Sequence, residues 1–294
     1  MTTREIIVAT AGTTHGEAAV RWAAREAERR GVLLRIAYVY DWEWREARFD
    51  YSNQYVGIAR QMAEAITTNG FDLARKVAPN VRIEVDTLMG HAASRLLAIA
   101  DRAELMVVGN RGRGGFASLL LGSVSQRVAV HAPCPVVVVR GRGDVTDGPV
   151  AVGVDDSPAA DHVLSTAFEA ASRRGTALAV VRSYLPPVPL WLAGTVPASD
   201  VATPEADAEE RARLEQLVAP WQAKYPDVAV ETMLSHDSAA SVLTGVSHGT
   251  QLVVVGTHGH GVLAGSFLGS TTMQLLHHAD CPVYIARIPR ERTT

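Results

Sequence analysis

Apolar and polar segments follow one another along the chain in an order that predicts strands and helices in turn. Short apolar runs at residues 6–10 (IIVAT), 105–108 (LMVV) and 135–139 (PVVVV) have the length and composition of buried strands. Longer segments rich in small apolar residues, such as residues 16–31 (GEAAVRWAAREAERRG), predict helices between them. Strands that alternate with helices indicate a parallel sheet, and continuously apolar strands fit a sheet covered on both faces.

The whole pattern occurs twice. Residues 27–40 (AERRGVLLRIAYVY) resemble residues 171–184 (ASRRGTALAVVRSY), and residues 104–115 (ELMVVGNRGRGG) match residues 251–262 (QLVVVGTHGHGV). A segment rich in Gly, Asp and Pro at residues 141–149 (GRGDVTDGP) separates the copies. We predict two tandem doubly wound α/β domains, residues 1–142 and 149–294, each a Rossmann-like five-stranded parallel sheet with helices on both faces. Ligands of such sheets bind beyond the carboxyl ends of the strands.

The amino-acid composition and net charge argue against some classes of function. The 294 residues are 47% hydrophobic and 20% charged with a net charge of -3, as in an ordinary globular protein. This balance gives no support for general binding to nucleic acid or to an anionic membrane, so an anion site must be local. The N-terminus resembles no signal peptide, and no apolar run approaches the ~18 residues of a membrane span. We therefore expect a cytoplasmic protein.

The two cysteines, Cys134 and Cys281, occupy the same position of the two copies. We expect both to be buried and inert, and not to form a disulfide framework of the kind that secreted proteins use.

A glycine-rich frame follows the most apolar strand of each copy. Gly109-x-x-Gly112, nine further residues and Gly122-Ser123 form it in the first copy, and Gly256-x-x-Gly259, nine residues and Gly269-Ser270 in the second. Glycines permit a close backbone approach, and inward-facing N–H groups can form a nest for anions. The last glycine and serine stand where a helix begins, which adds unpaired N–H donors and partial positive charge. The frame therefore predicts a polyphosphate site.

The glycine frame has other interpretations, and the sequence argues against each of them. Glycine, serine and a helix cap are also ordinary turn chemistry, but their exact repetition favours a site. No lysine stands in a GK[ST] arrangement, so the loop is not of the Walker type. No GxGxxG follows the first strand, which argues against a dinucleotide site.

These residues resemble the universal stress protein superfamily over nearly the whole chain. The repeated frame, the APCPV and ADCPV segments and the opening VGVDDSPAADHVL of the second copy carry the resemblance. It implies a fold of the adenine nucleotide alpha hydrolase type and ATP at the carboxyl ends of the first and fourth strands. For a metal, a nucleotide-bound Mg²⁺ held through the phosphates is favoured over a zinc cluster. The residues that it assigns to the nucleotide are Val39, Gly109, Gly112, Arg113, Gly122, Ser123, Val124 and Ser125 in the first copy, and Asp155, Ser183, Gly256, Gly259, His260, Gly269, Ser270, Thr271 and Thr272 in the second.

Each copy departs from the family pattern. In the first copy Ala11 stands where the second has Asp155, the acidic residue expected to help hold the adenosine end; Thr10, Thr13 and Thr14 are alternative polar groups there. In the second copy His258 and His260 replace Arg111 and Arg113. Arginine stays charged at neutral pH, whereas a histidine near its reference pKa of ~6.5 is mostly neutral. We hypothesise that the two sites are unequal and that the second responds to pH.

Several alternatives remain open at this point. The histidines near residues 258–260 and 277–278 with Cys281 raise the alternative of a zinc site, but their placement at opposite ends of the fourth helix argues against it. The aromatic segment at residues 40–55 and the Pro-rich segment at residues 184–197 are either packed connections or lids. The function is either a nucleotide-dependent regulator or sensor with at most slow ATP hydrolysis, an ATP-hydrolysing or nucleotidyl enzyme of similar fold, or a stress protein that has lost nucleotide binding. The resemblance also implies pairing through edge strands at residues 135–140 and 282–287, as an intrachain pseudo-dimer and a homodimer.

Overall fold

The chain divides into two compact units between Asp144 and Val145, inside the segment that the sequence marks as a linker. The last described residues, Arg287 and Ile288, are assigned to the first unit, so the second unit ends at Ala286. The structure, a computed structural model, describes residues 4–40, 54–112, 121–184, 203–257 and 268–288. The predicted domain limits of residues 1–142 and 149–294 lie close to this division and remain predictions.

The first unit contains a five-stranded parallel sheet in the order β3-β2-β1-β4-β5. Its elements are β1 (Glu5–Ala9), α1 (Thr14–Arg30), β2 (Leu33–Tyr40), α3 (Gln54–Val77), β3 (Ile83–Met89), α4 (Ala92–Ala100), β4 (Leu105–Gly109), α5 (Ser123–His131) and β5 (Val136–Val139). The chain runs outward from β1 to β3 and then returns to β4 and β5 on the other side of β1. Strand order therefore reverses between β1 and β4, which is where doubly wound sheets bind ligands.

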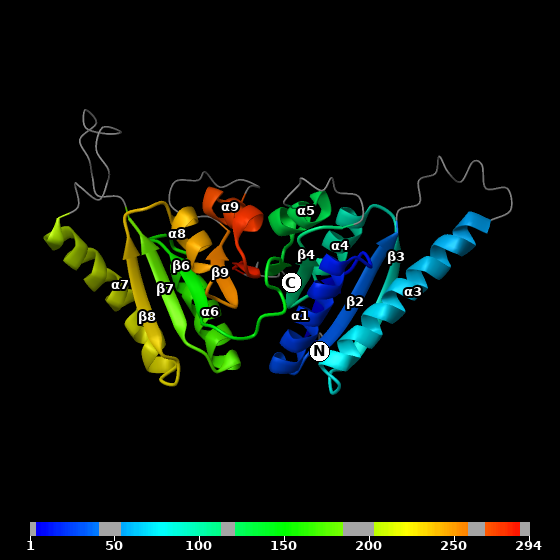
Figure 1. Cartoon of the computed structure of the whole chain (residues 1–294), viewed down its shortest axis with the longest axis horizontal. Helices are drawn as coiled ribbons and strands as arrows, with labels where there is room; N and C mark the ends of the chain where they lie inside the picture. The colour runs from blue at the N-terminus through cyan, green and yellow to red at the C-terminus, as the bar shows by residue number, and fades with distance from the viewer. Residues whose placement is uncertain (1–3, 41–53, 113–120, 185–202, 258–267, 289–294) are drawn as a thin grey trace, which may run out of the picture. The chain divides into compact units, whose positions relative to one another are not determined.

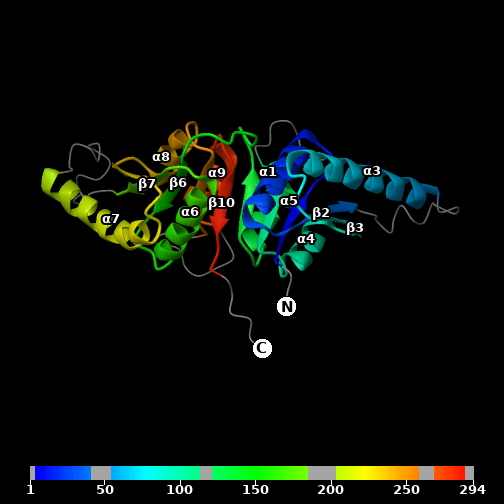
Figure 2. The same cartoon turned by 90° about the horizontal axis from the view of Figure 1, so that it is seen from below.

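Helices cover both faces of this sheet, as Figures 1 and 2 show. Helices α1 and α3 pack on each other and on one face, and α4 and α5 pack on each other and on the opposite face. The central strands are fully buried between these layers; Ile6, Ile7 and Val8 of β1 are 0% exposed. This burial explains why the strands are continuously apolar rather than alternating.

The second unit repeats this architecture with the order β10-β9-β6-β7-β8, again all parallel. Its elements are β6 (Val150–Val154), α6 (Ala160–Arg174), β7 (Leu178–Ser183), α7 (Pro204–Lys224), β8 (Val230–Ser235), α8 (Ala239–Val246), β9 (Leu252–Gly256), α9 (Ser270–His278) and β10 (Val283–Ala286). The predicted fold class is confirmed in both copies.

Capping residues set both ends of α1 and the C-terminal end of α6. Thr13 caps α1 by accepting a hydrogen bond from the N–H of Gly16 at 3.3 Å. Helices α1 and α6 both end on a glycine in the left-handed conformation, Gly31 with φ 63° and Gly175 with φ 60°. A side chain with a Cβ is strained at such a φ, so the repeated RRG ends both helices at equivalent places.

Both cysteines are buried, as expected, and they are not joined to each other by a disulfide. Burial raises the pKa of the Cys134 thiol to about 11, so the reactive thiolate is scarce at neutral pH.

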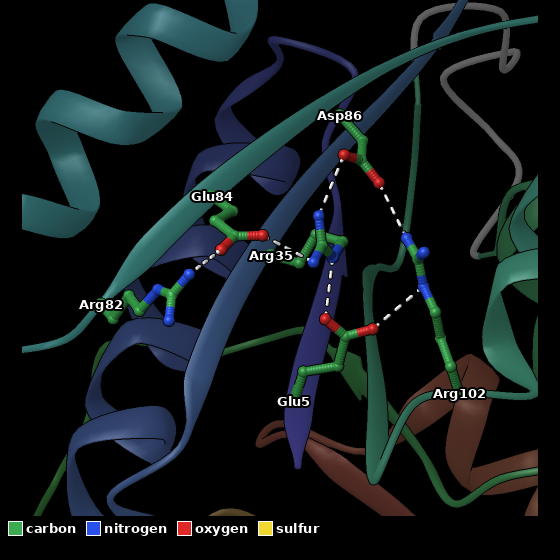
Figure 3. A network of polar contacts seen from close by, with 6 residues as sticks. All are labelled: Glu5, Arg35, Arg82, Glu84, Asp86 and Arg102. Carbon is green, nitrogen blue, oxygen red and sulfur yellow. Dashed lines mark hydrogen bonds and ion pairs between the residues drawn. The ribbon is translucent and has the colours of Figure 1, made fainter. Parts of the chain in front are cut away.

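A network of charged side chains lies on the sheet of the first unit (Figure 3). Arg35 of β2 contacts three carboxylates, at 2.8 Å to Glu5 of β1, 2.7 Å to Glu84 and 3.1 Å to Asp86 of β3. Arg102 contacts Glu5 at 3.0 Å and Asp86 at 2.9 Å, which closes a ring of four residues. Because the Glu5 side chain is only 4% exposed, these two arginines take the place of water as partners of its carboxylate.

The network belongs to the first unit alone. The strand registers place Ala179 at the position of Arg35 and Met233 at the position of Asp86. The second unit therefore reaches the same strand order without this cluster.

We expect Arg35→Ala to lower the free energy of unfolding by about 2–4 kcal/mol, because Glu5 would keep a buried charge with one partner fewer. Urea denaturation followed by circular dichroism measures this change. Arg60→Ala is the matched control, since Arg60 and Glu64 form a pair with side chains 74% and 57% exposed. That control should change stability by less than about 0.5 kcal/mol. Equal effects of the two substitutions would contradict the structural role of the network.

Candidate functional site

A cavity of about 350 Å³ opens at the carboxyl ends of β1 and β4 in the first unit. The ends of these strands, the start of α1, the first turn of α4 and the start of α5 form its walls. This is the place where the strand order reverses. The first pocket therefore lies where the topology predicts a ligand site.

A second cavity, of about 200 Å³, occupies the equivalent place in the second unit. It lies between the ends of β6 and β9, the first turn of α8 and the start of α9. We refer to these two cavities as the first pocket and the second pocket.

The structure brings the predicted site residues together around these two pockets. The predicted residues that line the first pocket are Val39, Gly109, Gly112, Gly122, Ser123, Val124 and Ser125. Those that line the second pocket are Asp155, Ser183, Gly256, Gly269, Ser270, Thr271 and Thr272. The remaining predicted residues, Arg113, Gly259 and His260, lie outside the described residues, as does His258.

Two hydrogen bonds fasten the glycine frame in each unit. The N–H of Gly122 donates to the carbonyl of Asn110 at 2.7 Å, and the N–H of Gly269 donates to the carbonyl of Thr257 at 2.8 Å. The Ser125 hydroxyl donates to the carbonyl of Gly109 at 2.6 Å, and the Thr272 hydroxyl donates to the carbonyl of Gly256 at 2.9 Å. The frame thus joins the helix start to the strand end, and the Ser125 and Thr272 hydroxyl protons are used within the protein.

Packing gives a further reason for the glycine that ends β4. A Cβ on Gly109 would lie 2.6 Å from the carbonyl oxygen of His15, in the first turn of α1. The absence of a side chain therefore lets the helix start approach the strand end, in addition to leaving room in the pocket. Gly112 is less crowded, since a Cβ there would meet only the Ala11 Cβ, at 3.8 Å.

The helix starts at the two pockets leave donors available. Helices α5 and α9 have the glycines Gly122 and Gly269 as N-caps, and neither has a side-chain capping bond. The first N–H groups of such a helix have no partner within the helix and carry partial positive charge. In the first pocket, the buried Nε of Arg111 has no hydrogen-bond partner among the described residues. These features fit an anionic group such as a phosphate.

Comparison with known proteins agrees with this geometry. The model of the Universal stress protein family matches the chain twice, over residues 2–140 and 148–287. The chain belongs to the universal stress protein family. A universal stress protein of Mycobacterium tuberculosis is 33% identical over 298 residues, which cover 96% of each chain. The crystal structure of a universal stress protein from Archaeoglobus fulgidus superposes with a TM-score of 0.72 at 15% identity, over 98% of this chain and 99% of that chain.

Some pocket residues of this universal stress protein were not predicted from the sequence. The first turns of α4 and α8 contribute Ala92 and Leu96 to the first pocket and Ala239 and Leu243 to the second. The signal was present in the repeated Ala-Ala-Ser at the start of both helices, which directly follow the third strand of each copy. Arg111 was noted as a loop residue but was not assigned to the site, although it lines the first pocket.

The strand registers show which positions of the two pockets correspond. In the first unit, Ile6 of β1 pairs with Leu105, which lies four residues before Gly109 at the end of β4. In the second unit, Val150 of β6 pairs with Leu252, which lies four residues before Gly256 at the end of β9. Ala11 and Asp155 lie five residues after Ile6 and Val150, just beyond the ends of β1 and β6. The structure therefore confirms that Ala11 occupies the place of the acidic residue.

Two carboxylates follow β6 at the mouth of the second pocket. Asp155 lines the pocket and accepts a hydrogen bond from the N–H of Ser157 at 3.0 Å, which shapes the turn. The next residue, Asp156, contacts the buried Arg182 of β7 at 2.7 Å, and Arg182 also contacts Glu210 of α7 at 2.8 Å. The hydrogen bond from Arg182 to Asp156 contributes most to raising the pKa of Arg182, so its charge is permanent.

A polar cluster lies just beyond the end of β7. Asp207 of α7 accepts a hydrogen bond from the Tyr184 hydroxyl and lies 2.8 Å from Nε2 of His236. The bond with Tyr184 lowers the pKa of Asp207 and raises the pKa of Tyr184 to about 12. These contacts thus join Tyr184, the residue that follows β7, and His236 to α7. Among the described residues, no three His, Cys, Asp or Glu side chains lie close enough to form a metal site.

Gly109→Ala should lower the free energy of unfolding by about 1–3 kcal/mol, because its Cβ meets a backbone oxygen that cannot move without shifting α1. Gly57→Ala is the control, since a Cβ on this exposed position of α3 meets nothing within 4 Å. That change should stabilise the protein by roughly 0.5–1 kcal/mol. Denaturant midpoints measure both effects, and an unchanged midpoint for Gly109→Ala would show that the close packing is not required.

Proposed function

We propose that this universal stress protein is a nucleotide-dependent regulatory or sensor protein and that its second pocket binds ATP. The observation that carries the proposal is that a carboxylate and a helix start with partial positive charge line the same cavity. Asp155 lies at one wall, and the uncapped start of α9 with Ser270 and Thr271 lies at another. A carboxylate accepts hydrogen bonds from hydroxyl or amino groups, whereas the helix start favours phosphate oxygens.

The residues of the second pocket divide into two groups by what they would bind. Asp155 and Ser183 provide polar atoms for the adenosine end, and Val181 and Leu243 provide apolar surface for the base. The N–H groups and hydroxyls at Ser270 and Thr271 would hold the phosphates. A Mg²⁺ ion that accompanies the nucleotide would be held mainly by the phosphates and by water.

The described residues favour binding over rapid hydrolysis. Phosphoryl transfer needs a group that positions the attacking water and strong stabilisation of the developing charge. Asp155 is the only ionisable side chain among the described residues that line the second pocket, and it is suited to the adenosine end. We therefore expect at most slow ATP hydrolysis, with ligand occupancy rather than turnover as the regulatory signal.

The proposal also covers how the protein assembles and where it acts. We propose that edge strands at residues 135–140 and 282–287 mediate pairing, both of the two domains and of two chains, and that the protein acts in the cytoplasm. No helix in the described part of the chain has the length and apolar character needed to cross a membrane. Sedimentation velocity at several protein concentrations tests the homodimer.

Mass spectrometry of the denatured, freshly purified protein should detect ATP, and calorimetric titration should detect its binding to the second pocket. Asp155→Asn should weaken that binding about tenfold or more, because a neutral amide removes a charge-assisted acceptor. Asp227→Asn, at an exposed position in the turn after α7, should leave the affinity unchanged.

A protein that neither carries ATP nor binds it in titration would favour a stress protein that has lost nucleotide binding. Hydrolysis at enzymatic rates would instead favour the nucleotidyl enzyme.

A further inference from the structure

The two pockets differ most at the end away from the glycine frame. Asp155 in the second pocket corresponds to Ala11 in the first, and Ser183 corresponds to Val39. All four residues line their pockets. The exchange replaces a carboxylate and a hydroxyl by two apolar groups.

No other carboxylate or carboxamide compensates for this exchange among the described residues that line the first pocket. Thr10 does line it, but its hydroxyl oxygen already accepts a hydrogen bond from the N–H of Gly12 at 3.2 Å. Apart from Tyr38, the other side chains of the inner wall are apolar, and they include Ala37, Leu96 and Val108. A ligand body rich in hydroxyl or amino groups would lose its bonds to water there and gain few in return.

By contrast, the first pocket has the groups that would bind an anion. Helix α5 starts without a side-chain cap, and Ser123 and Val124 line the cavity at that start. Arg111 adds a permanent positive charge, and its buried Nε has no hydrogen-bond partner among the described residues. A buried donor without an acceptor is unfavourable, so this end is prepared for an anionic oxygen.

The first pocket is also the larger of the two, about 350 Å³ against about 200 Å³. The first pocket therefore combines a larger space with apolar walls beside its anion-binding end. A cavity of this size lies in the range of small-molecule sites.

We propose that the first pocket binds a water-soluble phosphate monoester with an apolar body, of the alkyl or prenyl phosphate type, in preference to a nucleoside phosphate. The phosphate lies at the start of α5 with Arg111, and the hydrocarbon chain lies against Val39 and Leu96. This assignment does not depend on nucleotide binding at the second pocket. The chain thus carries two pockets of common origin that select different ligands.

The test is calorimetric titration of the full chain with Thr271→Trp, which fills the second pocket from the start of α9. The probes are butyl, hexyl and octyl phosphate, each below its critical micelle concentration, with hexanol, inorganic phosphate and ATP as comparisons. Burial of each CH₂ is worth about 0.8 kcal/mol, so the affinity should rise about fourfold per CH₂ until the chain fills the pocket. Hexanol, inorganic phosphate and ATP should each bind at least about tenfold more weakly than hexyl phosphate. Hexanol lacks the phosphate, inorganic phosphate lacks the apolar chain, and ATP has a polar body in its place.

Two variants test the assigned residues, with circular dichroism as the check on folding. Arg111→Gln should weaken hexyl phosphate about tenfold or more and leave the weak binding of hexanol unchanged. The double variant Ala11→Asp with Val39→Ser gives the first pocket the polar groups that the second pocket has. It should therefore weaken the binding of hexyl phosphate and strengthen the binding of ATP.

The inference is overturned if ATP binds the Thr271→Trp protein more tightly than hexyl phosphate does, if the affinity does not depend on chain length, or if none of the probes binds. Val124→Trp is the matched variant that fills the first pocket and should abolish binding of alkyl phosphates. ATP titrated into the Val124→Trp protein tests the second pocket alone. Failure of the nucleotide proposal is thereby distinguished from failure of this one.

Discussion

The site depends on the pair of hydrogen bonds that closes the glycine frame in each unit. One bond joins the N-cap glycine to the residue after the fourth strand, and the other joins a hydroxyl on the helix to the glycine that ends that strand. These bonds fix where α5 and α9 begin relative to β4 and β9. The orientation of the free N–H groups, and hence the place where an anion can bind, follows from them.

Much of the fold and most of the site could be predicted from the sequence, because the repeat and the apolar strands are local signals. The buried β1 and β4 and the Gly31 and Gly175 helix ends are cases where composition alone dictates the element. The hydrogen bonds of Ser125 and Thr272 to carbonyl groups could not be predicted, since a hydroxyl near a helix start serves a ligand or the backbone equally well. The contact of Gly109 with His15 joins residues far apart in the chain, and only the folded structure brings them together.

The two copies show how far a duplicated site can diverge without loss of its frame. The backbone donors come from the fold, so they persist whatever the surrounding side chains are. Ala11, Val39 and Arg111 are side-chain differences on that common backbone, and they alter the polarity of the walls and the charge at the mouth. Selectivity thus resides in a few positions at strand ends, while the capacity to hold an anion resides in the main chain.

The placement of Arg182 has a mechanical consequence for the second unit. Arg35 lies in the first half of β2, joins β2 to β1 and β3, and does not line the first pocket. Arg182 stands near the carboxyl end of β7, beside the turn that carries Asp155, and reaches Glu210 of α7. Two ion pairs through Arg182 therefore join that turn to α7. In the second unit the turn beside the pocket is thus tied to the helix that packs on β8, whereas the charged network of the first unit links strands and Arg102.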